Sequence, residues 1–324
     1  VLTQSWFKAA NLHNYLLHGL DLTAPVGVIR GYPPGTATVP DGITDPKWAS
    51  GLATGPGYRL NIREPIAEQL AWLARRRPRY LLTYPSNLEA MAAHVRQHAI
   101  DVSFIEHVHT IGEALRPETR ALAEAAFACT LVDTYSSVEL GLLAWQCPGE
   151  DYYLAAAATH YIEILRDDGE PCVPGESGRV VITPLHNFAT PMIRYANGDI
   201  AEVGEPCRHG RALPVIRRIM GRERNMLMLA DGARRWMMVS PELIGKYMPI
   251  VRAQILQTAL DRIEVRVQLR GELPEGAEAR CTAAILADMP GHYSVAYRYE
   301  DEIDLGPGGK FEDFVCQVPP GGSP

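Results

Sequence analysis

The chain has 324 residues, of which 47% are hydrophobic and 21% charged, and its formal net charge is −7. This length allows a substantial core and suggests two domains, and the composition is typical of a soluble globular protein. The acidic balance argues against a broad nucleic-acid or membrane surface, and the apolar stretch 122–132 is too short to cross a bilayer. Six cysteines are scattered without a compact framework, which favours reduced thiols in a cytoplasmic protein.

The first 135 residues alternate between helical and strand-like patterns. We expect a helix near residues 4–20, followed by an irregular segment rich in Pro and Gly up to about residue 60. The spacing of apolar residues then predicts a helix at Ile66–Arg76, a strand at Tyr80–Thr83, a helix that begins at Pro85 with Ser86 as its cap, a strand at Phe104–Ile111, a helix at Arg116–Phe127 and a strand at Cys129–Tyr135. This alternation predicts an α/β fold with parallel strands and crossover helices.

The pattern changes after residue 152, where short strands separated by turns predict an antiparallel or mixed β subdomain. Its expected strands are Tyr161–Leu165, Gly178–Thr183, Ile200–Val203 and Pro214–Met220. A small α+β unit follows, with strands at Met226–Leu229, Ile263–Leu269 and Ser294–Tyr299 and helices at Pro241–Met248 and Gly276–Asp288. We therefore divide the chain into a domain of residues 1–221 and a smaller domain of residues 222–324.

Five short motifs occur at positions that suggest a nucleotide site. Tyr135-Ser136-Ser137-Val138-Glu139 follows a buried strand, where an open α/β sheet typically binds ligands, and Thr110-Ile111-Gly112-Glu113 ends the preceding strand. Arg194-Tyr195-Ala196-Asn197-Gly198-Asp199 comes next, and the pair Gly221-Arg222 and the loop Gly308-Gly309-Lys310-Phe311 follow it. Each motif has a structural alternative: a strand end, a strand-to-helix turn, an Asn-Gly-Asp hairpin turn, or a solvated linker or loop.

Taken together, these motifs resemble the nucleotide-binding series of adenylate-forming (acyl-activating) enzymes, in particular the phenylacetate–CoA ligase branch. The resemblance implies a large AMP-binding domain followed by a small C-terminal domain. It also implies a two-step reaction, in which ATP activates a carboxylic acid as acyl-AMP and a thiol then takes the acyl group. The thiol would belong to CoA or to the phosphopantetheine of a carrier protein, and an aromatic acid is favoured by the resemblance alone.

The resemblance assigns roles to individual residues. Asp199 would accept hydrogen bonds from the ribose hydroxyls, Arg222 would contact ribose or phosphate, and Glu139 would help to hold Mg²⁺. Lys310 would approach the carboxylate and the α-phosphate during adenylation, where a cation stabilises developing negative charge. The remaining nucleotide-binding residues would be Gly112, Glu113, Thr134, Tyr135 and Ser136, with Tyr135 lying against adenine.

Three positions depart from the family pattern. Ser136 replaces Gly, Val138 replaces a hydroxyl residue and so cannot donate to phosphate, and Arg224 stands where a hinge Asp is common. A structural zinc occurs in some relatives, and Cys147, Cys207 and His209 are candidate ligands. Tetrahedral zinc needs four such ligands, and His160 is the only further candidate that we identify. The alternative is that the cysteines are buried core thiols and that His209 is a surface residue.

A Ser/Thr/Gly-rich phosphate loop is expected before the first motif, and this sequence, which begins at Val1, does not contain one. We therefore interpret the chain as such a ligase without its N-terminal portion, and we expect it to bind adenylate better than ATP, because such a loop holds the β- and γ-phosphates. An alternative is a catalytically silent adenylate-binding or interaction protein derived from the enzyme. A third interpretation is that an upstream segment or another chain supplies the loop.

Overall fold

The computed structural model describes residues 2–49, 51–236, 241–287, 289, 291–304 and 311–319. The chain divides into two compact units, with the boundary between Gly221 and Arg222. The helices of the first unit are α1 (Leu2–Leu17), α2 (Ile66–Arg76), α3 (Pro85–His98) and α4 (Pro117–Phe127). Its strands are β1 (Val26–Arg30), β2 (Ile43–Asp45), β3 (Gly57–Asn61), β4 (Tyr80–Thr83), β5 (His107–Ile111), β6 (Thr130–Ser137), β7 (Gly141–Gln146), β8 (Tyr153–Ala155), β9 (His160–Leu165), β10 (Ser177–Pro184), β11 (Tyr195–Val203) and β12 (Val215–Arg222).

These twelve strands form one sheet in the order β2-β3-β1-β4-β5-β6-β7-β8-β12-β11-β10-β9. Strands β3, β1, β4, β5 and β6 are parallel, as the alternation of helices and strands predicted. From β6 onwards the strands pair in antiparallel fashion, as in β6 with β7, β7 with β8, β8 with β12, and β10 with both β11 and β9, which confirms the predicted β subdomain. The fold is therefore α/β with a mixed sheet.

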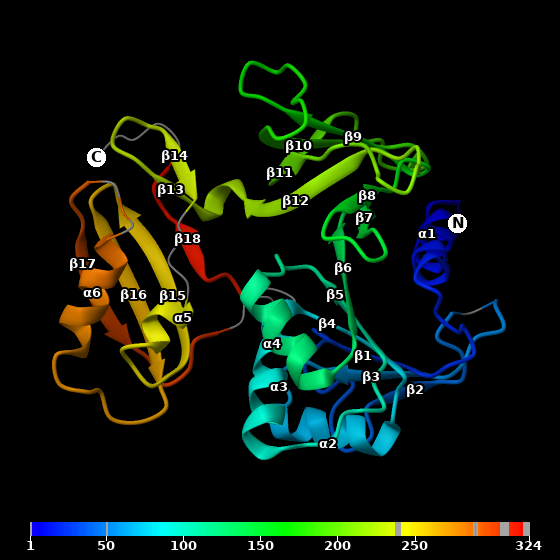
Figure 1. Ribbon diagram of the computed structural model, residues 1–324, viewed down its shortest axis with the longest axis horizontal. Coiled ribbons are helices and arrows are strands. Elements are labelled where there is room, and N and C mark those ends of the chain that lie inside the picture. The colour runs from blue at the N-terminus through cyan, green and yellow to red at the C-terminus, as the bar shows by residue number, and fades with distance from the viewer. Residues whose placement is uncertain are drawn as a thin grey trace. The chain divides into compact units, whose positions relative to one another are not determined.

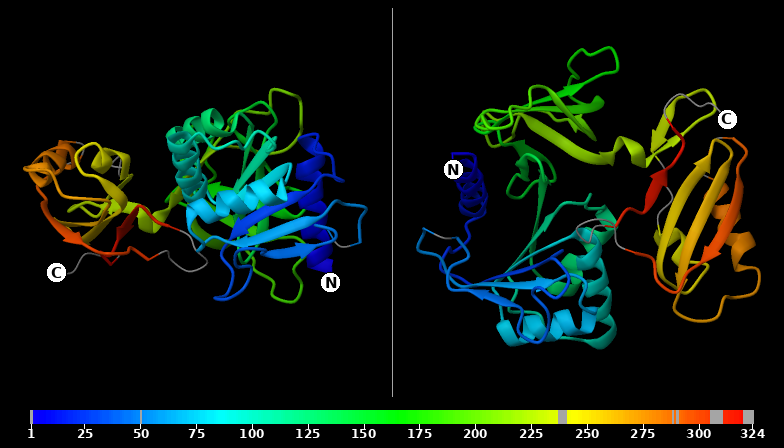
Figure 2. Two further views of the ribbon diagram at one scale, coloured as in Figure 1. Left: turned by 90° about the horizontal axis from the view of Figure 1, so that it is seen from below. Right: turned by 180° about the vertical axis from the view of Figure 1, so that it is seen from behind.

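Helices α2, α3 and α4 cover one face of the parallel strands (Figures 1 and 2). Helix α2 buries Leu70, Trp72 and Leu73 against this face, and each apolar side chain of this size contributes roughly 1.5–3 kcal/mol on burial. The helix ends where Arg77 adopts a left-handed conformation and donates its backbone N–H to the carbonyl of Leu73. Arg75 and Arg76 therefore lie in the last turn of the helix, where cations are favourable.

The opposite face of the parallel strands meets α1 and the segment that follows it. Tyr15 of α1 packs edge-on against both Trp48 and His109, with ring centroids 5.3 and 5.2 Å apart. Val108 points into the helical side, and His109 points to the α1 side, because successive residues of a strand alternate between faces. The parallel strands are thus covered on both faces, as is usual for such sheets.

The second unit contains the 3-10 helix η1 (Glu223–Asn225), the helices α5 (Pro241–Gly245) and α6 (Ala277–Ala287), and strands β13 (Met226–Met228), β14 (Arg234–Trp236), β15 (Ile250–Ala259), β16 (Arg262–Leu269), β17 (Ser294–Tyr299) and β18 (Phe314–Cys316). A four-stranded sheet runs β17-β16-β15-β18, and β13 pairs with β14. Gln257 of β15 is fully buried, and its amide group accepts from the backbone N–H of Met228 and donates to the carbonyl of Met228, both at 2.8 Å. One side chain thus ties β13 to the sheet.

Several sequence predictions about local structure were wrong. Strands β1 and β3 lie in the segment that we expected to be irregular, because each is only five residues long and lies between proline- and glycine-rich turns. Strand β15 was not predicted, although it pairs with both β16 and β18. Ser86 is not the cap of α3: the N-cap is Tyr84, which makes no side-chain capping bond, and Ser86 has a different partner.

Candidate functional site

The carboxyl ends of β5 and β6 lie side by side at the point where the first two motifs occur. Ile111 pairs with Thr134 in parallel register, and Thr134 is buried. Gly112 follows β5 with a φ of 85°, which a residue with a side chain rarely adopts. The turn of the Gly112-Glu113 motif is therefore adjacent to the strand that carries the Tyr135 motif, at the edge where parallel sheets bind ligands.

Tyr135 and Asp199, predicted to bind the two ends of an adenosine group, are in direct contact. The hydroxyl of Tyr135 on β6 donates to Oδ2 of Asp199 on β11 at 2.6 Å. Asn197 joins them, because its Nδ2 lies 2.6 Å from Asp199 Oδ2 and 2.7 Å from the Tyr135 oxygen. The backbone N–H of Asp199 donates to Oδ1 of Asn197 at 3.1 Å. Sequence reasoning missed the part played by Asn197, although its place two residues before an Asp was a usable signal.

The Asn197-Gly198-Asp199 segment lies inside strand β11 and does not form a hairpin turn, so that structural alternative is wrong. Gly198 has a φ of 79°, and the pairing of β10 with β11 shifts register between Arg179 and Val181 on the facing strand. An irregularity of this kind changes the directions in which nearby side chains point. Here it accompanies the turning of Asn197 and Asp199 towards Tyr135.

Glu113 is bound to the start of α3. Its carboxylate accepts the backbone N–H of Ser86 at 2.9 Å and the Ser86 hydroxyl at 3.0 Å. A carboxylate is stabilised at a helix N-terminus, where backbone N–H groups lack intrahelical partners. This contact fixes the turn after β5 to the turn after β4. Sequence analysis identified both residues but not their pairing.

A buried carboxylate, that of Asp133, connects strand β6 to two other strands close to the site. Asp133 Oδ1 accepts from the hydroxyl of Thr110 on β5, and Oδ2 accepts from the hydroxyl of Tyr153 on β8, both at 2.5 Å. Burial raises the pKa of Asp133 above its usual range, and these two hydrogen bonds oppose that shift. Asp133 thus connects three strands two residues before Tyr135, a role that its sequence position did not reveal.

Glu139, the predicted magnesium ligand, lies in the turn between β6 and β7 with an exposed side chain. It lines a small cavity with Thr3, Trp6, Phe7, Ala10, Leu140, Leu142, Thr159, His160, Pro184, His186 and Asn187. Val138 beside it is 88% exposed, and Ser136 is half-buried. Among the described residues no group of three or more metal-binding side chains is present, so the magnesium role of Glu139 stays a prediction.

Of the key residues of the last two motifs, the structure describes Arg222 but not Lys310. Arg222 ends β12 with an exposed side chain, directly after Gly221, whose φ is 117°. Its contact with ribose or phosphate stays a prediction. Lys310, with the neighbouring Gly308 and Gly309, lies outside the described residues. The catalytic role of Lys310 therefore rests on the sequence.

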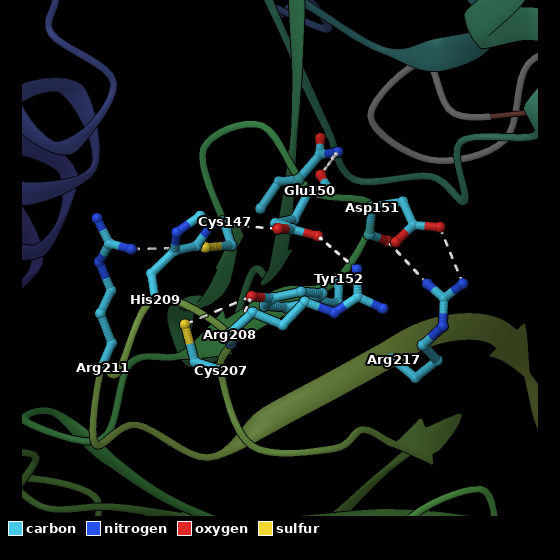
Figure 3. Close-up of polar contacts among 10 residues, drawn as sticks. Cys147, Glu150, Asp151, Tyr152, Cys207, Arg208, His209, Arg211 and Arg217 are labelled. Carbon is cyan, nitrogen blue, oxygen red and sulfur yellow. Dashed lines mark hydrogen bonds and ion pairs between the residues drawn. The ribbon is translucent and has the colours of Figure 1, made fainter.

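The three proposed zinc ligands do not form a ligand set (Figure 3). Cys147 and Cys207 are both buried in one apolar cluster, but His209 Nε2 lies 3.1 Å from Glu150 Oε1. His160 lies elsewhere, between the carbonyl of Leu140 and the Thr159 hydroxyl. Within the part of the chain that the structure describes, a zinc site is not supported. All six cysteines are free thiols, as expected.

The fold is that of adenylate-forming ligases. The 2-hydroxyisobutyryl-CoA ligase in its postadenylation state, in complex with 2-HIB-AMP, matches 97% of this chain and 70% of its own with a TM-score of 0.69 and 17% identity. The anthranilate CoA ligase AuaEII in complex with anthranoyl-AMP matches 94% of this chain and 60% of its own with a TM-score of 0.65 and 16% identity.

A sequence relative supports the branch that the motifs indicated. A phenylacetate–coenzyme A ligase of Thermus thermophilus is 30% identical over 110 residues, which is 32% of this chain and 24% of the relative. No protein-family model matches the sequence. The resemblance to adenylate-forming enzymes, and to their phenylacetate–CoA ligase-like branch, is thereby confirmed. The matched region spans about a quarter of the relative's length.

No helix within the described residues is long and apolar enough to span a membrane. Helix α1 has 16 residues, and the stretch 122–132 is divided between α4 and β6.

Proposed function

We propose that the protein takes part in ATP-dependent activation of a carboxylic acid to an acyl adenylate, followed by transfer of the acyl group to a thiol. The observation that carries this proposal is the contact of Tyr135, Asn197 and Asp199 at the carboxyl end of β6. The resemblance to adenylate-forming enzymes assigns the tyrosine to adenine and the carboxylate to ribose independently of this contact. The two residues are 64 positions apart along the chain.

The Asp199 carboxylate is suited to bind ribose. A carboxylate can accept about four hydrogen bonds, so its two oxygens can serve several donors at once, including the vicinal hydroxyls of ribose. Binding both side chains fixes its orientation before the nucleotide arrives, which reduces the entropic cost of binding. Residues 1–221 would thus be the adenylate-binding domain and the following residues the small C-terminal domain.

The rate of the reaction would be raised mainly by positioning the reactants and by stabilising the negative charge that develops. Lys310 would stabilise the developing negative charge as the substrate carboxylate attacks the α-phosphate, while Arg222 and Mg²⁺ held by Glu139 would neutralise the phosphates. The substrate would be a small carboxylic acid, and the thiol that of CoA or a phosphopantetheine carrier. An aromatic acid is the first choice, because the relative that is 30% identical is named for phenylacetate.

Acid-dependent exchange of pyrophosphate into ATP tests the proposal. The wild-type chain is assayed with a panel of aryl and short aliphatic acids, and Lys310→Ala is compared with Lys246→Ala, an exposed lysine of the second unit. We expect exchange with at least one acid, its loss in Lys310→Ala and its retention in Lys246→Ala. Adenylate binding without exchange for any acid would favour a catalytically silent adenylate-binding protein. The observation that supports this alternative is the exposed Val138, which stands next to Glu139 in place of a hydroxyl residue.

A further inference from the structure

Helix α3 carries two histidines near its C-terminal end. His94 and His98 are four residues apart in this helix, which ends at His98. Side chains four residues apart in an α-helix lie on the same side, one turn above the other. Their imidazole rings accordingly lie close together, with centroids 4.2 Å apart and an angle of 41° between the ring planes. The helix thus holds two potential metal ligands next to each other.

Both imidazoles are accessible from solvent. His98 is exposed, and His94 is half-buried at the border of the helix face that buries Met91 and Val95. Within the part of the chain that the structure describes, neither ring takes part in a hydrogen bond or an ion pair. A neutral imidazole has one nitrogen whose lone pair can bind a ligand. The lone pairs of both rings are therefore available to an ion from solution.

A second group of neighbouring histidines differs in both respects. The rings of His18 and His109 are 6.2 Å apart, and His109 is only 2% exposed. Nε2 of His18 lies 2.9 Å from the carbonyl oxygen of Gln146, so this nitrogen already has a partner. A hydrated ion therefore has access to the pair on α3 but not to the buried group.

The distance between the two rings of the α3 pair indicates the class of ion that fits. If each nitrogen lies about 2.1 Å from the metal, the ring centroids are about 4.5 Å apart for a right angle at the metal and about 5 Å apart for a tetrahedral angle. The observed 4.2 Å is nearer to the first value. Right angles between ligands are typical of square-planar and tetragonal ions, of which Cu²⁺ and Ni²⁺ are the common examples with nitrogen ligands.

The end of the helix also favours a cation. Ala99 adopts a left-handed conformation with a φ of 50° and donates its backbone N–H to the carbonyl of Val95, which closes the helix. The C-terminal end of a helix carries a partial negative charge from its unpaired carbonyl groups. Arg96 lies between the two histidines in sequence but on a different side of the helix, because residues two apart do not face each other.

We propose that His94 and His98 bind one divalent transition-metal ion of the tetragonal class, Cu²⁺ or Ni²⁺, at the C-terminal end of α3. Each imidazole supplies one nitrogen lone pair. Among the described residues no group of three or more metal-binding side chains is present, so water would occupy the remaining positions. Because one turn of helix already holds both rings in place, the second ring binds at little further entropic cost.

This metal site is separate from the candidate adenylate site. Ser86, which contacts Glu113, lies in the first turn of α3, and His98 is the last residue of the same helix. The rise of an α-helix places these two ends roughly 18 Å apart along its axis. The inference therefore goes beyond the proposed function and can be tested without any nucleotide.

Calorimetric titration of NiCl₂ into the folded 324-residue chain tests the inference. Ni²⁺ is the probe because, unlike Cu²⁺, it does not oxidise the six free thiols of the chain. We expect wild type to bind Ni²⁺, and His94→Gln and His98→Gln each to lose at least about tenfold in affinity, because each variant keeps only one imidazole of the pair. The loss should be larger for Ni²⁺ than for Zn²⁺; a larger loss for Zn²⁺ would overturn the choice of ion class.

Two further variants are matched controls. His98→Gln combined with Arg96→His keeps the number of histidines but places the second imidazole on another side of the helix, so it should not restore binding. His292→Gln removes an exposed histidine of the second unit and should bind Ni²⁺ as wild type does. The proposal is overturned if wild type binds no Ni²⁺, or if His98→Gln binds it as tightly as wild type. Circular dichroism checks that each variant is folded.

Discussion

The hydroxyl of Tyr135 donates a hydrogen bond of 2.6 Å to the carboxylate of Asp199. Tyr135 lies near the end of β6, the strand that borders the parallel part of the sheet. Asp199 lies in β11, a strand of the antiparallel part. The continuous sheet thus brings together two motifs that the sequence places far apart. The adenylate site that we propose depends on this junction between the two parts of the sheet.

Tyr135→Phe should weaken the binding of an acyl-adenylate analogue about five- to tenfold. The substitution keeps the ring that would lie against adenine and removes one hydrogen bond that orients Asp199, and such a bond is worth about 1 kcal/mol. Isothermal titration calorimetry measures the affinity. Tyr161→Phe, which changes a 60% exposed tyrosine on β9, is the matched control and should bind as wild type does. Equal affinities for the two variants would contradict the proposed role.

Ser86→Ala should destabilise the first unit by about 1 kcal/mol, because the Glu113 carboxylate loses the hydroxyl donor at the start of α3. Urea unfolding followed by circular dichroism measures the change. Ser103→Ala removes a hydroxyl from an exposed local turn with Asp101 and should cost less. If both variants lose the same stability, the contact between Ser86 and Glu113 does not hold the two turns together.

The buried His109 should make the protein sensitive to mild acid. Burial lowers the pKa of His109 to about 3, and neither ring nitrogen has a hydrogen-bond partner within the described structure. The unfolded chain, with an ordinary pKa near 6.5, then binds a proton that the folded chain does not, so stability falls as pH drops from about 6.5 towards 3. His18 and His107 lie nearby, and the pKa of each is also lowered by burial.

The measurement compares unfolding free energies at about pH 7 and about pH 5 for wild type and His109→Leu. One such site contributes a slope of up to about 1.4 kcal/mol per pH unit, and the variant should lose most of this contribution. His292→Leu, an exposed histidine of the second unit, should keep the wild-type slope. An unchanged slope in His109→Leu would show that this imidazole does not govern acid stability.

Gln257→Leu should destabilise the second unit by about 2–4 kcal/mol, because the leucine is similar in size but leaves the backbone N–H and carbonyl of Met228 buried without their partner. Hydrogen exchange should show faster exchange of the β13 amides. Gln268→Leu on the neighbouring strand β16, where the side chain is half-buried, should leave exchange in β13 as it is in wild type. Wild-type protection of β13 in Gln257→Leu would contradict this role.

The sequence predicted those elements whose pattern is local and strong. Helix α2 and strand β4 have the predicted bounds, because a helical apolar face and a short buried apolar run are readable without the rest of the chain. Strand β15 was missed because its buried residues include Gln257, whose polar partners are Met228 of β13 and Cys316 of β18. Likewise, α1 was predicted to extend to residue 20 but ends at Leu17, because its end depends on the turn at Gly19.

The candidate site was partly predictable, because its motifs are also local patterns in the sequence. Tyr135, Asp199 and Glu113 were identified from motifs, which record residue types and order. Their contacts with Asn197 and Ser86 were not, because those contacts depend on how separate strands and a helix start are brought together in space. The sequence also suggested a zinc ligand set that the geometry does not support, since His209 turns to Glu150.

The most direct test of the central claim is calorimetric titration of an acyl-adenylate analogue into wild type and Asp199→Asn. The account predicts binding by wild type and a loss of at least about tenfold in affinity for the variant, because the amide replaces a charged acceptor by a neutral one. Glu202→Gln on the same strand, whose carboxylate pairs with Arg218 at 2.6 Å, should bind as wild type does. No binding by wild type, or equal binding by wild type and Asp199→Asn, would contradict the account.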